Sequence, residues 1–123
     1  MDWTIAVIAV AAVAALYLLK RMSMLSEESA RRLLAEGALV IDVRSPEEFR
    51  DRQVPGAVNI PLSQIKEALP KRVPNHSTPL LLHCLSGTRS GMAKQQLKSM
   101  GYKNVHNLGS YSRAKKIVES QKK

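Results

Sequence analysis

The 123-residue sequence contains only one cysteine, one tryptophan, one phenylalanine and three histidines. A single thiol cannot form a disulfide within the chain. One cysteine and three dispersed histidines give no cluster at metal-ligand spacing, so no metal site is expected. Aromatic residues make up 4% of the chain and no nucleic-acid-binding motif is present. Nucleic acid is therefore not an expected partner, despite a formal net charge of +9.

Basic residues are absent from the first 19 positions, which carry a single charge on Asp2. The stretch Trp3–Leu19 is uncharged, and as a helix it would extend about 26 Å. The hydrocarbon core of a bilayer is about 30 Å thick, so this length is close to that of a membrane span. Lys20 and Arg21 follow directly, a pattern typical of an anchor whose following domain faces the cytoplasm.

We therefore predict a transmembrane anchor over residues 1–21 that contacts the membrane through residues 3–19. Residues 22–123 then form one domain on the cytoplasmic side of a bacterial-type inner membrane, in a single-pass protein. The alternative is a cleaved signal peptide, which would leave the domain in the periplasm. No basic region precedes the apolar run, as a signal peptide would require, although the alanine-rich centre of the run is compatible with cleavage.

Beyond residue 22, short apolar runs alternate with helical patterns. Runs typical of buried strands occupy residues 38–43, 79–83 and 105–108, and VPGAVNIP at 54–61 reads as a turn followed by a short extended piece. Helical patterns start at Ser26, Ser45, Leu62, Ser90 and Ser112. This alternation predicts an α/β fold with a largely parallel sheet and helices on both faces. Ligands of such sheets bind beyond the carboxyl ends of the strands.

The only cysteine, Cys84, lies at such a strand end, within the stretch LLHCLSGTRS. Gly87 permits a tight turn before the following helix, so backbone N–H groups of the loop can point at the sulfur. Amide groups and a helix N-terminus lower the pKa of a thiol and make it reactive. The alternative is an inert buried thiol, because free cysteines are often buried.

The spacing between Cys84 and Arg89 separates two chemistries. A protein tyrosine phosphatase loop has five residues between its cysteine and its arginine, whereas here there are four, Leu85–Thr88. The smaller loop suits a sulfur atom attached to the cysteine better than a phosphoryl group. A phosphatase or an arsenate reductase is therefore disfavoured.

Three ordered stretches resemble the rhodanese family, whose active loop has six residues and begins with the nucleophilic cysteine. VIDVRSPEEF at 40–49 resembles the first family signature, VPGAVNIP at 54–61 the second, and residues 84–109 the active loop, helix and last strand. The likeness covers roughly residues 24–116. It implies a rhodanese-like α/β fold with a parallel central sheet flanked by helices, preceded here by one transmembrane helix.

The resemblance also implies a thiosulfate or persulfide sulfurtransferase that needs no metal or organic cofactor. Cys84 would take a sulfane sulfur from a small donor and pass it, as a persulfide, to cyanide, a thiol or a protein thiol. The substrate cradle would be formed by Leu85, Ser86, Gly87, Thr88 and Arg89. The alternative function is a membrane-tethered, non-enzymatic module that carries sulfur or binds a partner.

Three charged residues, Asp42, Arg44 and Glu48, are expected to support the loop structurally. Arg89 has two open roles: its charge can lower the pKa of Cys84, or it can pair beneath the loop with Asp42 or Glu48. His83 is expected to pack in the core rather than act as a general base.

Two departures from the family pattern bear on these expectations. The fold usually ends on two glycines, whereas here Gly109 is followed by Ser110, which raises the question of how the C-terminal region packs. Leu85 and Ser86 are uncharged at positions where thiosulfate-preferring rhodaneses often carry basic residues. The identity of the sulfur donor therefore stays open.

Overall fold

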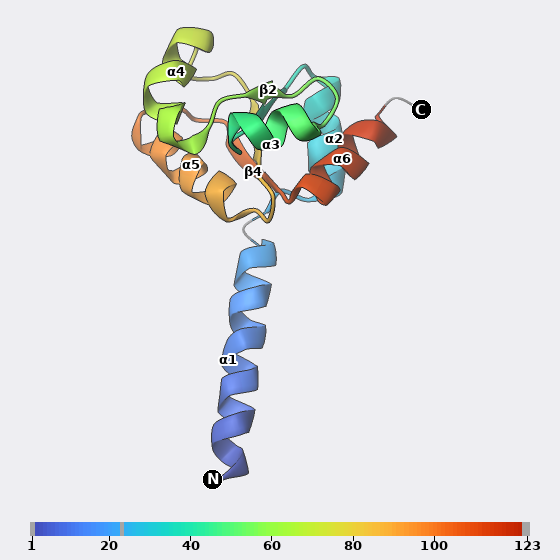
Figure 1. Cartoon of the computed structure of the whole chain (residues 1–123), viewed down its shortest axis with the longest axis vertical. Coiled ribbons are helices and arrows are strands. Elements are labelled where there is room, and N and C mark those ends of the chain that lie inside the picture. The colour runs from blue at the N-terminus through green and yellow to red at the C-terminus, as the bar shows by residue number, and fades with distance from the viewer. Residues whose placement is uncertain (1, 23, 122–123) are drawn as a thin grey trace.

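A computed structural model describes residues 2–22 and 24–121, apart from the side chains of residues 20–22. Helix α1 (Trp3–Met22) projects from a compact α/β part that contains all the strands (Figure 1). The remaining elements are, in chain order, α2 (Glu27–Ala35), β1 (Leu39–Asp42), α3 (Pro46–Asp51), β2 (Val58–Asn59), the 3₁₀ helix η1 (Leu62–Gln64), α4 (Ile65–Arg72), β3 (Leu80–His83), α5 (Thr88–Ser99), β4 (Val105–Gly109) and α6 (Tyr111–Ser120).

The four strands form one parallel sheet in the order β2-β1-β3-β4. Because side chains alternate along a strand, Ile41 and Leu82 face a core shared with α4 and α5. Val40 and Leu81 face the opposite core, which α2 and α6 cover. The predicted parallel sheet with helices on both faces is therefore confirmed, and its central strands are buried as parallel strands usually are.

Local sequence signals set most helix ends. Ser26 accepts a hydrogen bond from the Ser29 N–H at the start of α2. Ser45 and Glu48 form a reciprocal capping box at the start of α3, where Pro46 occupies the first turn. Helix α4 contains Pro70 and continues past it to Arg72. Only the last turn follows the proline, so little of the helical hydrogen bonding is lost.

Ser110 resolves the question raised by the missing second glycine. Its side chain caps α6 by accepting a hydrogen bond from the Arg113 N–H, and Tyr111 behind it is buried. Gly109, in contrast, has a φ of 101°, and an added Cβ would lie 2.7 Å from the Met24 sulfur. Glycine is thus required at position 109 by the left-handed backbone conformation and by the lack of room for a Cβ. Position 110 instead favours a residue that can cap a helix.

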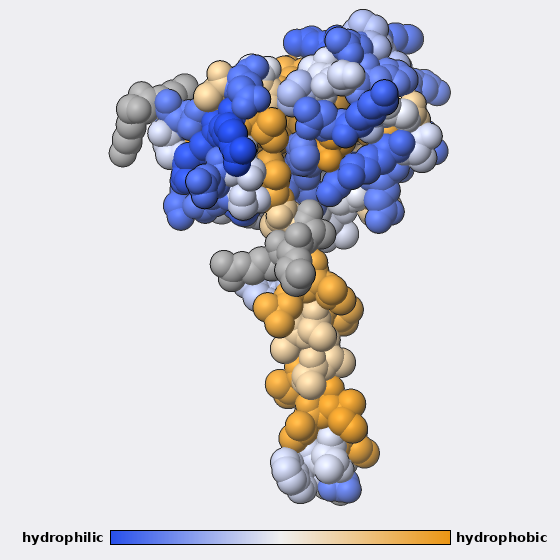
Figure 2. Space-filling model, turned by 180° about the vertical axis from the view of Figure 1, so that it is seen from behind, coloured by the Kyte–Doolittle hydropathy of each residue, from blue (hydrophilic) through white to orange (hydrophobic). Residues whose placement is uncertain are grey.

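The predicted transmembrane anchor is wrong. Among the residues that the structure describes, none belongs to a helix long and apolar enough to cross a bilayer. The uncharged part of α1 stops at Leu19, about 26 Å from its start, which is shorter than a hydrocarbon core of about 30 Å. Figure 2 shows hydrophobic residues along α1 and mostly hydrophilic residues on the visible face of the α/β part.

The inner-membrane localisation derived from this anchor is wrong with it, and the membrane contact through residues 3–19 is not shown. The side chains of Lys20 and Arg21, which oriented that prediction, lie outside the described residues. The domain boundary at residue 22 stays a prediction.

Candidate functional site

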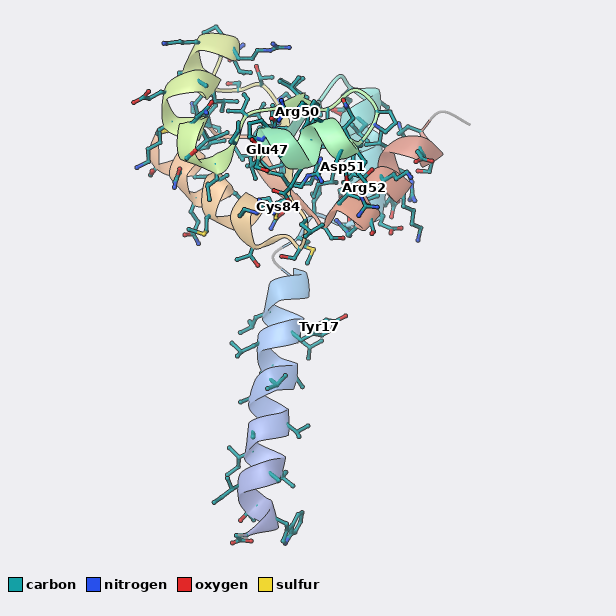
Figure 3. All side chains as sticks on the ribbon, viewed as in Figure 1. Tyr17, Glu47, Arg50, Asp51, Arg52 and Cys84 are labelled. Carbon is teal, nitrogen blue, oxygen red and sulfur yellow. The ribbon has the colours of Figure 1, made fainter. Side chains whose placement is uncertain are left out.

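Cys84 follows β3 at the carboxyl edge of the sheet, and Figure 3 shows it on the side of the α/β part that faces α1. The residue is fully buried, and its backbone N–H donates to the Gly109 carbonyl at 3.2 Å. Its Sγ accepts a hydrogen bond from the Gly87 N–H at 3.0 Å and lies 3.5 Å from the Ser90 hydroxyl, whose single proton can donate to the sulfur or to the Asn107 side chain. The loop therefore folds back over the sulfur and directs donors at it.

The left-handed conformation of Gly87 makes this arrangement possible. Gly87 has a φ of 97° and is the N-cap of α5, which starts at Thr88, two residues before the predicted Ser90. Only glycine adopts such a φ without strain, so the chain can reverse directly from β3 into a helix. The sulfur thus lies close to the N-terminus of a 12-residue helix, where the helix dipole favours an anion.

Opposing effects act on the pKa of Cys84. Burial favours the neutral thiol and raises the pKa. Hydrogen bonds from the side chain and backbone of Ser90 and from the amides of Gly87 and Ser86 favour the thiolate, and together they lower the pKa below its ordinary value. The site therefore stabilises a negative charge on sulfur.

Asn107 in β4 holds the loop in this shape. Its side-chain amide donates to the Gly87 carbonyl at 3.1 Å, and its oxygen accepts from the Ser90 hydroxyl at 2.7 Å and from the Gly109 N–H at 3.0 Å. Neither Asn107 nor Ser90 was identified as a site residue from the sequence. Asn107 lies in a predicted strand, and the sequence does not indicate its hydrogen-bond partners because they are up to 20 positions away in the chain.

Arg89 points to α3 rather than to the sulfur. Its guanidinium makes a bidentate ion pair with the Glu48 carboxylate, at 2.7 Å and 3.0 Å. The Arg89 hydrogen bond, opposed by burial and aided by bonds from Ser45, lowers the pKa of Glu48 to about 2. Because Glu48 also completes the capping box of α3, this pair connects the active loop to that helix.

Asp42 and Arg44 form a second, buried pair at the carboxyl end of β1. Arg44 donates to both Asp42 carboxylate oxygens, with Nη2 to Oδ2 at 2.8 Å, and also to the Arg52 carbonyl at 2.7 Å. The Arg44 guanidinium lies 4.8 Å from the centre of the Tyr111 ring. These contacts join β1, the chain after α3, and α6 beneath the site. The predicted supporting residues Asp42, Arg44 and Glu48 therefore make structural contacts around the loop.

His83 is buried in the core next to Cys84. Its Nδ1 lies 3.3 Å from the Cys84 carbonyl oxygen, and its Nε2 has no hydrogen-bond partner among the described residues. Burial lowers the pKa of His83, partly offset by the nearby Asp42 carboxylate. A buried imidazole whose ring centre lies 6.3 Å from that of Tyr111 fits a packed side chain rather than a general base.

The other loop residues form the outer surface of the cradle. Leu85, Ser86 and Thr88 are exposed, and the Leu85 carbonyl accepts a hydrogen bond from the Tyr111 N–H at 3.2 Å. The loop thus directs backbone N–H groups toward the Cys84 sulfur and presents uncharged side chains to solvent. No group of three or more potential metal ligands occurs in the described part of the chain.

The fold and the loop define an α/β domain built around a thiolate-stabilising cysteine. The model of the rhodanese-like domain family matches residues 26–116, which is well over half of the chain, and this chain belongs to that family. Thiosulfate sulfurtransferase PspE of Escherichia coli K12 is 44% identical over 69 residues, a match that covers 56% of this chain and 66% of that protein.

Two human matches, one by sequence and one by structure, extend the comparison. Thiosulfate:glutathione sulfurtransferase is 37% identical over 93 residues, covering 63% of this chain and 78% of that protein. The solved structure of the human single-domain sulfurtransferase TSTD1 superposes with a TM-score of 0.66 at 34% identity, covering 74% of this chain and 93% of that one. These relatives confirm the predicted enzyme class, a rhodanese-like sulfurtransferase.

Proposed function

We propose that this chain transfers a sulfane sulfur from thiosulfate or a persulfide donor, through a persulfide on Cys84, to a thiol or cyanide. The observation that carries the proposal is the placement of the sulfur. The Cys84 Sγ accepts a hydrogen bond from the Gly87 N–H at 3.0 Å. It lies in a loop whose backbone N–H groups point inward, at the N-terminus of α5. Those donors stabilise a thiolate and equally the terminal sulfur of a persulfide anion.

In the first half-reaction, the Cys84 thiolate attacks the sulfane sulfur of thiosulfate. A sulfur–sulfur bond forms with Cys84, the sulfur–sulfur bond of thiosulfate breaks, and sulfite leaves with the bonding electron pair. The anionic charge stays on the outer sulfur of the new persulfide. The inward amides of the loop from Leu85 to Arg89 are the groups proposed to hold that charge.

In the second half-reaction, an acceptor thiolate or cyanide attacks the outer sulfur. The bond to the Cys84 sulfur breaks, and the thiolate is restored for another cycle. Arg89 is proposed to act by positioning the loop through Glu48, because its guanidinium is occupied by that carboxylate. Asp42 and Arg44 are proposed to support the sheet edge below.

The test separates an enzyme from a sulfur carrier. The full chain is incubated with thiosulfate, its intact mass is measured, and turnover with cyanide is followed in parallel. An added sulfur atom with sustained turnover, both absent in Cys84→Ser, supports the enzyme. A stable added sulfur with negligible turnover towards cyanide and thiols supports the carrier. Unchanged turnover in Cys84→Ser contradicts both.

A further inference from the structure

His83 is the one polar residue of β3, a strand that otherwise consists of three buried leucines. Its side chain is fully buried, and its Nε2 atom has no hydrogen-bond partner among the described residues. A buried polar atom without a partner costs stability, and an apolar side chain at this position would avoid that cost. Packing alone therefore does not explain why a histidine directly precedes Cys84.

Each ring nitrogen of His83 lies near an oxygen that accepts hydrogen bonds. Nδ1 is 3.3 Å from the Cys84 carbonyl oxygen, and Nε2 is 3.7 Å from Oδ2 of Asp42, the register partner of His83 on β1. A neutral imidazole carries a single N–H, so one of its two nitrogens then has only a lone pair near an acceptor. The protonated ring has two N–H groups and can donate to both oxygens after a small movement towards Asp42.

Burial and the surrounding charges act in opposite directions on this ring. Burial lowers the pKa of His83, the Asp42 carboxylate on β1 raises it, and the Arg44 guanidinium on the same side lowers it. On α6, the Tyr111 ring centre lies 6.3 Å from that of His83. On β4, the register partner is Gly109, which has no side chain. A negative charge that develops close to the ring therefore favours the protonated form.

The Cys84 carbonyl links His83 to the active loop. This carbonyl and the Leu85 N–H belong to one peptide group, so a hydrogen bond accepted by the oxygen polarises the N–H on the other side. The Leu85 N–H is one of the amides proposed to hold the outer sulfur of the persulfide. A stronger hydrogen bond from His83 therefore makes this amide a better donor to an anionic sulfur.

We propose that His83 is a positioning residue whose protonation is coupled to the negative charge on the sulfur of Cys84. The inference rests on the proposed function, in which that charge is carried by the thiolate and then by the persulfide. The anionic sulfur favours uptake of one proton from water by His83, whose two N–H groups then donate to the Cys84 carbonyl and to Asp42. By reciprocity, the protonated ring stabilises the anionic sulfur. His83 itself contacts no substrate.

The first test follows the imidazole signals of the full chain by NMR as a function of pH. The persulfide form is compared with Cys84→Ser, and the His83 signals are assigned by their absence in His83→Phe. The pKa of His83 should be higher in the persulfide form, because only that form carries the additional negative charge. His76, which is exposed, and His106, which is half-buried on β4, should titrate alike in both forms. A His83 titration that is the same in both forms would overturn the inference.

The second test uses two substitutions that a packing role and a positioning role rank in opposite order. His83→Phe keeps the volume of the ring but removes its N–H donors. His83→Asn is smaller and leaves a cavity, but it keeps an N–H at the place of Nδ1. We expect His83→Phe to slow persulfide formation from thiosulfate about threefold to tenfold, as read by intact mass. His83→Asn should retain most of the rate despite a lower melting temperature, and His106→Asn is the matched control.

Two results of this second test contradict the positioning role: a slower reaction in His83→Asn than in His83→Phe, which indicates packing, or equal rates in all chains. An ultraviolet titration of the thiolate keeps the outcome separate from that of the proposed function. Even in a chain that never acquires a sulfur atom from thiosulfate, the pKa of Cys84 should be higher in His83→Phe than in the natural chain. Superimposable titrations would overturn the role of His83, whether or not the persulfide forms.

Discussion

The Arg89–Glu48 pair yields a prediction whose size follows from the structure. The pKa of Glu48 falls from 4.5 to about 2, mainly through the Arg89 hydrogen bond. Taken in full, this shift corresponds to about 3 kcal/mol of folding stability. The Arg89 and Glu48 side chains are 35% and 31% exposed, so solvent screening reduces the contribution to about 1–2 kcal/mol.

The perturbation is Glu48→Gln, which removes the charge but keeps a side chain able to complete the capping box of α3. We expect a loss of about 1–2 kcal/mol in urea unfolding at pH 7, or a melting temperature about 5–10 °C lower. Glu47→Gln is the matched control, because Glu47 lies on the same helix, is 74% exposed and should contribute almost nothing.

The pH dependence gives a second check on the same pair. The folded-state pKa of Glu48 is depressed, so its contribution is fully present above about 4.5 and is lost as the pH falls toward about 2. The stability difference between the natural chain and Glu48→Gln should therefore shrink across this window. A Glu48→Gln cost no larger than that of Glu47→Gln, or one that stays constant down to the lower end of the window, would refute the reasoning.

Two further predictions concern the residues around the loop. Ser90→Ala should raise the pKa of Cys84, because the Ser90 hydrogen bond is the strongest effect favouring the thiolate. An ultraviolet titration of the thiolate checks this, and a curve that overlays the natural one contradicts it. Asp42→Asn should cost about 3–5 kcal/mol in urea unfolding, because it leaves the buried Arg44 guanidinium without its counter-charge. A loss below about 1 kcal/mol would show that the pair is not important for stability.

Much of the fold could be predicted from the sequence because its signals are local. The apolar runs around Ile41 and Leu82 indicate buried parallel strands without reference to distant residues. The serine caps and Gly87 likewise act within a few positions of themselves. The loop around Cys84 was predictable for the same reason, since the turn, the thiol and the helix start are adjacent in the chain.

The features that could not be predicted depend on contacts between residues far apart in the chain, or on the exact length of an apolar run. The link from Asn107 to Ser90 joins side chains 17 positions apart, and the pair Arg89–Glu48 joins side chains 41 apart. The sequence left Asp42 and Glu48 as equal partners for Arg89, and only the folded geometry distinguishes them. The N-terminal prediction failed on length, because an uncharged run that ends at Leu19 is shorter than a bilayer core.

The most direct test of the central claim is the mass of the intact chain after treatment with thiosulfate and removal of the excess. The unmodified protein should gain the mass of one sulfur atom, and subsequent addition of cyanide should remove it. Cys84→Ser should gain nothing, while Ser86→Ala, which alters an exposed hydroxyl on the same loop, should still gain the sulfur. A sulfur adduct that persists in Cys84→Ser, or an unmodified protein that never acquires one, would contradict a persulfide on Cys84.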